Sequence, residues 1–267
     1  MNTVLDLWFV AGLGWQVAGA AAATVLSQGA MALFILVYAH RRYPLLRLSL
    51  KEPLFRREDF AQGLRFGLPP ALQFSVTAGG NIALQNFMNG FGSHTVAITT
   101  AYRVDTIMLL PIINLGSAIS TMVAQSKGAG EPQRARHFWR TGAVMNLVVS
   151  LLLMAVMLLF GGKLVALFGV EAEAAAIGRR FFQRISLFYV FFGLACSMRG
   201  TIEGTGRVVY SSAVSIAALL LRIALSYLLA GAFLNMAIAY AEGLHWIFMV
   251  LCFLPFFLRR DRWAQNS

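Results

Sequence analysis

Long apolar runs, each of the length needed to cross a bilayer, constrain this chain most strongly. A hydrocarbon core about 30 Å thick takes about 20 residues of α-helix. Hydrophobic residues make up 58% of the 267 residues and charged residues only 12%. The charge-poor runs cover residues 16–39, 66–91, 96–126, 141–162, 177–198, 208–231 and 235–258. We therefore predict an all-α, polytopic transmembrane helix bundle of about seven spanning helices.

An apolar stretch also precedes the first of these runs. Residues 2–12 are apolar but too short to cross a bilayer alone. We interpret them as an N-terminal partial helix, the end of a helix whose beginning is not in the sequence.

The basic residues fall between the apolar runs and are distributed unequally over the two sides of the membrane. Sixteen Lys and Arg residues lie on one side, including those that follow the last run, and five on the other. Because cytoplasmic loops are enriched in Lys and Arg, the C-terminus is predicted to be cytoplasmic. This clustering suits the headgroups of the lipid bilayer, so the net charge of +11 does not indicate nucleic-acid binding.

One long polar connection divides the chain. Residues 41–65 carry seven basic residues and form a predicted cytoplasmic linker, of which 57–64 suit an amphipathic helix on the membrane surface. Residues 1–40 then end one helical unit, 66–258 form a six-helix unit, and 259–267 form a cytoplasmic tail. Arg41 and Arg259, each the first of a basic pair, are 218 residues apart and end similar helical outlines, which indicates an internal repeat.

Neutral polar residues recur every four positions on the second predicted helix. They are Gln73, Thr77, Asn81 and Gln85, and the next span adds Asn114, Ser117, Thr121 and Gln125. Such groups need partners within a bilayer. We expect either a wet substrate cleft lined by these side chains or hydrogen bonds between helices.

Three of the charged residues inside predicted spans are candidates for a role, because charge is costly there. Arg222 and Glu242 lie at similar depths on the last two helices and are expected to form a structural ion pair. A transport role for Glu242 is the alternative. Asp105 either faces the substrate cleft and attracts cations, or lies near the outer interface.

The sequence offers no basis for catalysis. No acid, base or nucleophile cluster is evident, and no glycine-rich phosphate loop with Lys is present. We therefore do not expect an enzyme, a cofactor or direct use of ATP.

Several motifs, taken in order, resemble those of the multidrug and toxic compound extrusion (MATE) transporters. They are residues 2–6, 19–24, 67–69 and 118–121, Gln125, residues 128–130, Arg134 with Ala135, Arg199 with Gly200, Gly204 and Gly206. The resemblance implies twelve helices in two six-helix lobes. Residues 1–40 would then end the first lobe and 66–258 would form the complete second lobe.

The resemblance also implies an ion-coupling site. Asn2, Asp6 and Thr24 match first-lobe residues that coordinate Na⁺ or carry H⁺, and no other metal is implied. A second branch of the family has a Tyr followed four residues later by an Asp on the tenth helix. Here Tyr189, counted among the cleft residues, is followed by Gly193. A second-lobe cation site of that kind is therefore not expected.

These observations predict a secondary active efflux transporter. Antiport of H⁺ or Na⁺ would drive export of drug-like or organic cation substrates across the bacterial inner membrane, by alternating access. Its partners would be a small-molecule substrate, the bilayer, and the missing first-lobe helices or another bundle, without which we expect no transport. A lipid or lipid-linked sugar flippase and a non-transporting membrane subunit are the alternatives.

Overall fold

The computed structural model describes residues 1–44 and 56–258. The middle of the predicted linker and the predicted tail at 259–267 lie outside the described residues. The chain divides into two compact units, Met1–Phe60 and Ala61–Ser267, which are considered separately. The division falls within the predicted linker of residues 41–65.

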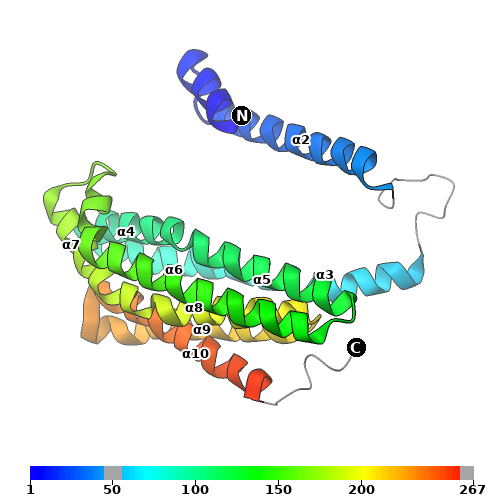
Figure 1. Ribbon diagram of the computed structural model, residues 1–267. Helices are drawn as coiled ribbons and strands as arrows, with labels where there is room; N and C mark the ends of the chain where they lie inside the picture. Colours follow the sequence, from blue (N-terminus) through cyan, green and yellow to red (C-terminus); the bar gives the residue numbers. More distant parts are fainter. Residues whose placement is uncertain (45–55, 259–267) are drawn as a thin grey trace. The chain divides into compact units, whose positions relative to one another are not determined.

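The first unit consists of a short helical segment folded against one long helix (Figure 1). Helix α1 (Asn2–Asp6) continues into the π-helical η1 (Leu7–Gly12), and α2 spans Gln16–Arg42. The turn between them uses Gly14 at φ 67°, a conformation that Gly adopts at little cost. A side chain at Gly19 would lie 3.1 Å from the Phe9 backbone. Small residues on α2 therefore allow the short segment to pack closely.

The second unit is a bundle of helices (Figure 1). Its elements are α3 (Arg57–Asn89), η3 (Gly92–His94), α4 (Thr95–Met108), α5 (Leu110–Gly128), α6 (Pro132–Ala166), α7 (Ala172–Ile185), η4 (Ser186–Phe188), α8 (Tyr189–Gly204), α9 (Val208–Phe233), η5 (Leu234–Met236) and α10 (Ala237–Leu258). The described residues contain no strand. The predicted all-α fold is confirmed.

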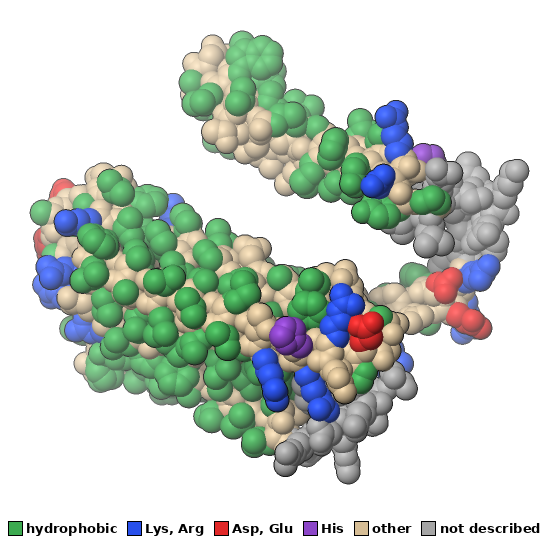
Figure 2. Space-filling view, in the orientation of Figure 1, with side chains coloured by type: hydrophobic (Ala, Val, Ile, Leu, Met, Phe, Trp, Pro, Cys, Tyr) green, Lys and Arg blue, Asp and Glu red, His purple; other side chains and the backbone are tan. Residues whose placement is uncertain are grey.

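Five stretches of the described chain are long and apolar enough to cross a membrane. They are Gln16–Arg42, Thr95–Gly128, Pro132–Ala166, Ala172–Gly204 and Val208–Leu258, the last of which comprises α9 and α10. The predicted span at 66–91 forms most of α3, which is not among these five. Figure 2 shows hydrophobic side chains over most of the visible sides of the second unit and charged ones mainly near its ends. The fold is that of a polytopic membrane protein.

Two details differ from the sequence-based expectations. Residues 57–64 do not form a separate surface helix, because they continue directly into α3. The predicted span at 96–126 is divided at Pro111, since α4 ends at Met108 and α5 begins at Leu110 with Pro111 in its first turn. Proline lacks an N–H and its ring would clash with the carbonyl four residues earlier, so it favours a helix start at this point.

Helix α8 is the centre of the bundle. It packs against α5, α6, α9 and α10. In the most apolar stretch of its span, Ala172–Gly204, 61% of the residues are buried, against 28% or less in the corresponding stretches of the others. A side chain at Gly200 would lie 2.2 Å from the Gly116 carbonyl oxygen, and one at Gly204 would lie 2.6 Å from the Ser120 carbonyl oxygen. The two glycines, four residues apart on one face of α8, therefore permit its close contact with α5.

Candidate functional site

The three residues implied as the ion-coupling site lie together in the first unit. The Asn2 amide donates to the Thr24 hydroxyl oxygen over 3.5 Å, and the Thr24 hydroxyl donates to the Ala20 carbonyl. Asp6 follows Asn2 by one helical turn. Its Oδ1 is buried and accepts no hydrogen bond from the described residues. An amide, a hydroxyl and a carboxylate in one region offer oxygen ligands for a small cation, or a carboxylate for a proton.

The polar stripe on α5 is exposed along its length. Asn114, Ser117, Thr121 and Gln125 follow one another at three- or four-residue spacing, on one face of the helix. We call these four residues the α5 polar face. In the described chain the first three hydrogen-bond only to carbonyls of α5 itself, over 2.8, 3.2 and 3.1 Å. Their side chains therefore do not bond across to another helix.

The stripe on α3 is less uniform. Gln73 is buried, Thr77 and Gln85 are half-buried, and Asn81 is exposed. Gln85 donates to Asn89 one turn further along α3, over 3.0 Å. These four residues therefore wrap around α3 from the core to the surface instead of forming one continuous exposed face.

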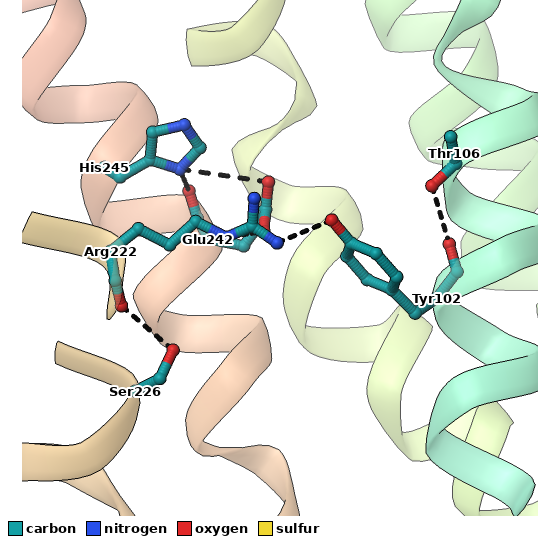
Figure 3. A network of polar contacts seen from close by, with 6 residues as sticks. All are labelled: Tyr102, Thr106, Arg222, Ser226, Glu242 and His245. Atoms are coloured by element: carbon teal, nitrogen blue, oxygen red, sulfur yellow. Dashed lines mark hydrogen bonds and ion pairs between the residues drawn. The ribbon is translucent and has the colours of Figure 1, made fainter. Parts of the chain in front are cut away.

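Arg222 and Glu242 meet in the interior, between α9 and α10 (Figure 3). Arg222 Nε lies 2.5 Å from Glu242 Oε2, and both side chains are less than a tenth exposed. Neither atom has an aligned hydrogen bond within the described part of the chain, so the contact is an ion pair. Arg222 Nη2 also donates to the Tyr102 hydroxyl over 2.6 Å. The ring nitrogen Nδ1 of His245 lies 2.8 Å from the Glu242 carbonyl oxygen.

Asp105 and Tyr189 form a second buried contact. The Tyr189 hydroxyl donates to Asp105 Oδ1 over 2.5 Å, and the exposed fractions are 0% and 1%. This contact joins α4 to the beginning of α8. Asp105 therefore lies in the core of the bundle and not on an exposed face.

Gly193 occupies a position with no room for a side chain. A Cβ there would lie 2.1 Å from Ser150 Oγ and 3.2 Å from the Asn146 carbonyl oxygen. The Asn146 amide in turn donates to the carbonyls of Ile112 and Gly193 and to the Ser197 hydroxyl, over 3.3, 3.1 and 3.0 Å. Side chains of α6 thus fill the space that an acid at position 193 would need.

Sequence reasoning did not single out Tyr102 or Asn146. Asn146 carries a signal in retrospect, because a lone amide inside the apolar run 141–162 requires buried partners. Tyr102 carries none, since its role depends on which side chain of α9 reaches it.

Comparison with known proteins identifies the family. The MatE family model matches residues 69–228, which is more than half of the chain. The chain belongs to the MatE family.

The relatives are transport and resistance proteins of greater length. The chain is 30% identical over 207 residues to the probable multidrug resistance protein YpnP of Bacillus subtilis, covering 77% of this chain and 46% of YpnP. It is 30% identical over 208 residues to YoeA of the same organism, also named a probable multidrug resistance protein, covering 75% and 44%. It thus spans about half the length of the curated relatives it matches.

The fold agrees with that of solved MATE structures. A MATE crystallised in complex with MaL6 superposes with a TM-score of 0.86 at 22% identity, covering 99% of this chain and 61% of the other. At this level of identity the match supports the fold and not the substrate.

Proposed function

We propose that this chain is part of a secondary active efflux transporter that exports drug-like or organic cation substrates. The α5 polar face is the observation that carries the proposal. Four polar side chains on an exposed helix face, within a largely apolar span, would be costly against lipid. They suit a water-filled cleft in which a broad, amphipathic substrate binds.

A substrate cleft along α5 also requires helices on its opposite side. The chain spans about half the length of its matched relatives, and we propose that helices equivalent to the remainder of such a relative face the α5 polar face. Transport would then follow alternating access of two helical lobes around a central site. The chain alone is accordingly expected not to transport.

A dye-accumulation assay in bacteria that lack efflux pumps tests this proposal. The chain would be expressed alone, and as a chimera in which it replaces the matching stretch of YpnP, with intact YpnP as the positive control. We expect the chimera to lower dye accumulation and the chain alone to leave it unchanged. A chimera that is inserted and stable but leaves the dye inside would contradict the proposal, and efflux by the chain alone would contradict the need for further helices.

We also propose that Asn2, Asp6 and Thr24 bind the coupling ion, H⁺ or Na⁺. The buried Asp6 Oδ1, which has no partner in the described chain, supports this assignment. In proteoliposomes of the chimera, an imposed pH or Na⁺ gradient should drive dye transport, and Asp6→Asn should abolish that response while leaving dye binding intact. Asp59→Asn, which changes an exposed acid at the start of α3, is the matched control. Unchanged gradient-driven transport in Asp6→Asn would contradict the assignment.

The unequal distribution of Lys and Arg over the two sides of the membrane further supports insertion in the bacterial inner membrane with the C-terminus in the cytoplasm. Fusions at the C-terminus check this. Green fluorescent protein should fluoresce and alkaline phosphatase should be inactive there, and the reverse would contradict the orientation.

A further inference from the structure

The buried polar contacts of the second unit form one connected cluster across four helices. Tyr189 of α8 donates to Asp105 of α4. Tyr102 stands one helical turn before Asp105, so both lie on the same side of α4. Tyr102 accepts from Arg222 of α9, which is paired with Glu242 of α10. Figure 3 shows Tyr102, Arg222 and Glu242 of this cluster.

The charges in this cluster do not balance. The cluster contains two carboxylates, Asp105 and Glu242, and one guanidinium, Arg222. Glu242 is in direct contact with Arg222, whereas among the described residues the one side-chain hydrogen bond to Asp105 comes from a neutral phenol. A buried charge without a counter-ion is strongly unfavourable. The cluster is neutral only if one of its groups carries an additional proton.

His245 does not supply the missing positive charge. Its Nδ1 lies against the Glu242 backbone carbonyl, a contact that the neutral ring makes with its single proton. Protonating the other nitrogen would place a second cation near Arg222, with which His245 interacts electrostatically. His245 Nδ1 lies 3.8 Å from Glu242 Oε1, which is too long for a hydrogen bond, and that carboxylate is already paired with Arg222.

Other charged groups on the packed elements lie at the surface. Helix α7 and the end of α6 pack against α4, and their charged residues are exposed or half-exposed, as is Arg103 of α4 itself. These residues are Lys163, Glu173, Arg179, Arg180 and Arg184. The charged groups that interact with Asp105 are Arg222 and Glu242, so the balance must be restored within the cluster.

We propose that Asp105 is a protonation site, which holds one proton in the folded chain and exchanges it with solvent when the cluster opens. Uptake forms one O–H bond on the carboxylate and adds one positive charge, and release returns that proton to water. Without the proton, the negatively charged Asp105 competes with Glu242 for Arg222. Arg222 already hydrogen-bonds to Tyr102, one helical turn before Asp105 on α4. This competition favours a different position of α4 relative to α9.

The consequence for transport rests on the proposed function. Helix α4 leads through the break at Leu109 into α5, where the α5 polar face begins at Asn114. A proton at Asp105 therefore acts on the same span that carries the proposed cleft surface. The site would couple the second lobe to the proton gradient independently of Asn2, Asp6 and Thr24.

Infrared spectroscopy of the purified full chain in lipid nanodiscs tests the protonation directly. With ¹³C-labelled aspartate, Glu242 does not contribute to the isotope-shifted signal. At neutral pH we expect a protonated-aspartate band that disappears in alkaline buffer. Because Asp6 is itself proposed to take up H⁺, the band is assigned in Asp6→Asn, which should keep the Asp105 signal, as should Asp59→Asn. Adding Asp105→Asn to Asp6→Asn should remove the band entirely. Absence of the band from Asp6→Asn, or its persistence after Asp105→Asn is added, would overturn the proposal.

Tyr189→Phe provides a second measurement should Asp105→Asn fail to fold. This variant keeps the carboxyl but removes its hydrogen-bond donor, so the band should remain and shift in frequency. An unshifted band would show that the protonated aspartate is not the one that Tyr189 contacts. Because the infrared measurement needs no transport, a missing band counts against Asp105 alone, and a chimera that fails to export dye counts against the proposed function alone.

Discussion

Buried charged side chains in the bundle depend on a few close neighbours. Arg222 and Glu242 are each less than a tenth exposed and pair with one another. Removing one member of such a pair leaves a buried charge without compensation, whereas replacing both with apolar residues of similar volume is often neutral. The pair therefore specifies how α9 and α10 meet more than it stabilises the fold.

A double-mutant cycle tests this view of the ion pair. Arg222→Met and Glu242→Leu should each lower the free energy of unfolding by about 3–5 kcal/mol, and the double variant should lose less than either single variant. Unfolding of the purified chain in mixed micelles measures all four forms. A double variant less stable than both singles would show that the two residues do not act as a pair.

Gly193 is expected to tolerate no larger residue. Gly193→Ala should lower the free energy of unfolding by about 1–3 kcal/mol through overpacking, because its Cβ would lie 2.1 Å from Ser150 Oγ. The same unfolding measurement on Gly193→Ala combined with Ser150→Gly should show a partial recovery. Equal losses with and without Ser150→Gly would mean that the crowding lies elsewhere.

The sequence predicts some of these contacts and not others, for a physical reason. Arg222 and Glu242 lie at similar depths on consecutive spans, so helix length alone suggests that they meet. Asp105 and Tyr189 are 84 residues apart in the chain. Their contact depends on how α4 and α8 pack, and periodicity carries no information about that.

At the level of helices, small residues determine which elements approach closely. Gly200 and Gly204 bring α8 against α5, and Gly80 faces Leu219 of α9. Most predicted spans coincide with helical stretches, because hydrophobic length determines both, but 96–126 and 177–198 are each divided between two α-helices. The π-helical η1 was not predicted, since it depends on local backbone geometry that hydropathy does not report.

A pair of glycine variants separates packing from helix propensity. Gly200→Ala should lower the unfolding midpoint of the purified chain, because the added Cβ would lie 2.2 Å from the backbone of α5. Gly79→Ala is the matched control, since nothing lies within 4 Å of a Cβ there. It should leave stability unchanged or raise it slightly, as Ala favours helices over Gly. A similar loss in both variants would contradict the close α5–α8 contact.

For the whole molecule, the distribution of exposed polar and apolar surface links fold to function. Large apolar side chains on α6 such as Leu152 and Leu159 are 61% and 73% exposed, as expected of helices that face lipid. The α5 polar face is the contrasting surface on a neighbouring helix. The family and the spans could be anticipated from sequence motifs and hydropathy, but the exposure of this face requires the packed bundle.

Cysteine accessibility of the α5 polar face tests the central claim most directly. In the YpnP chimera, with Cys196 and Cys252 and any cysteines of the YpnP part replaced by Ala, Ser117→Cys and Leu152→Cys would each be treated with a membrane-impermeant maleimide. The account predicts rapid labelling at position 117, slowed by a transported dye, and none at the lipid-facing position 152. Failure to label position 117, or equal labelling at both positions, would contradict a water-filled substrate cleft along α5.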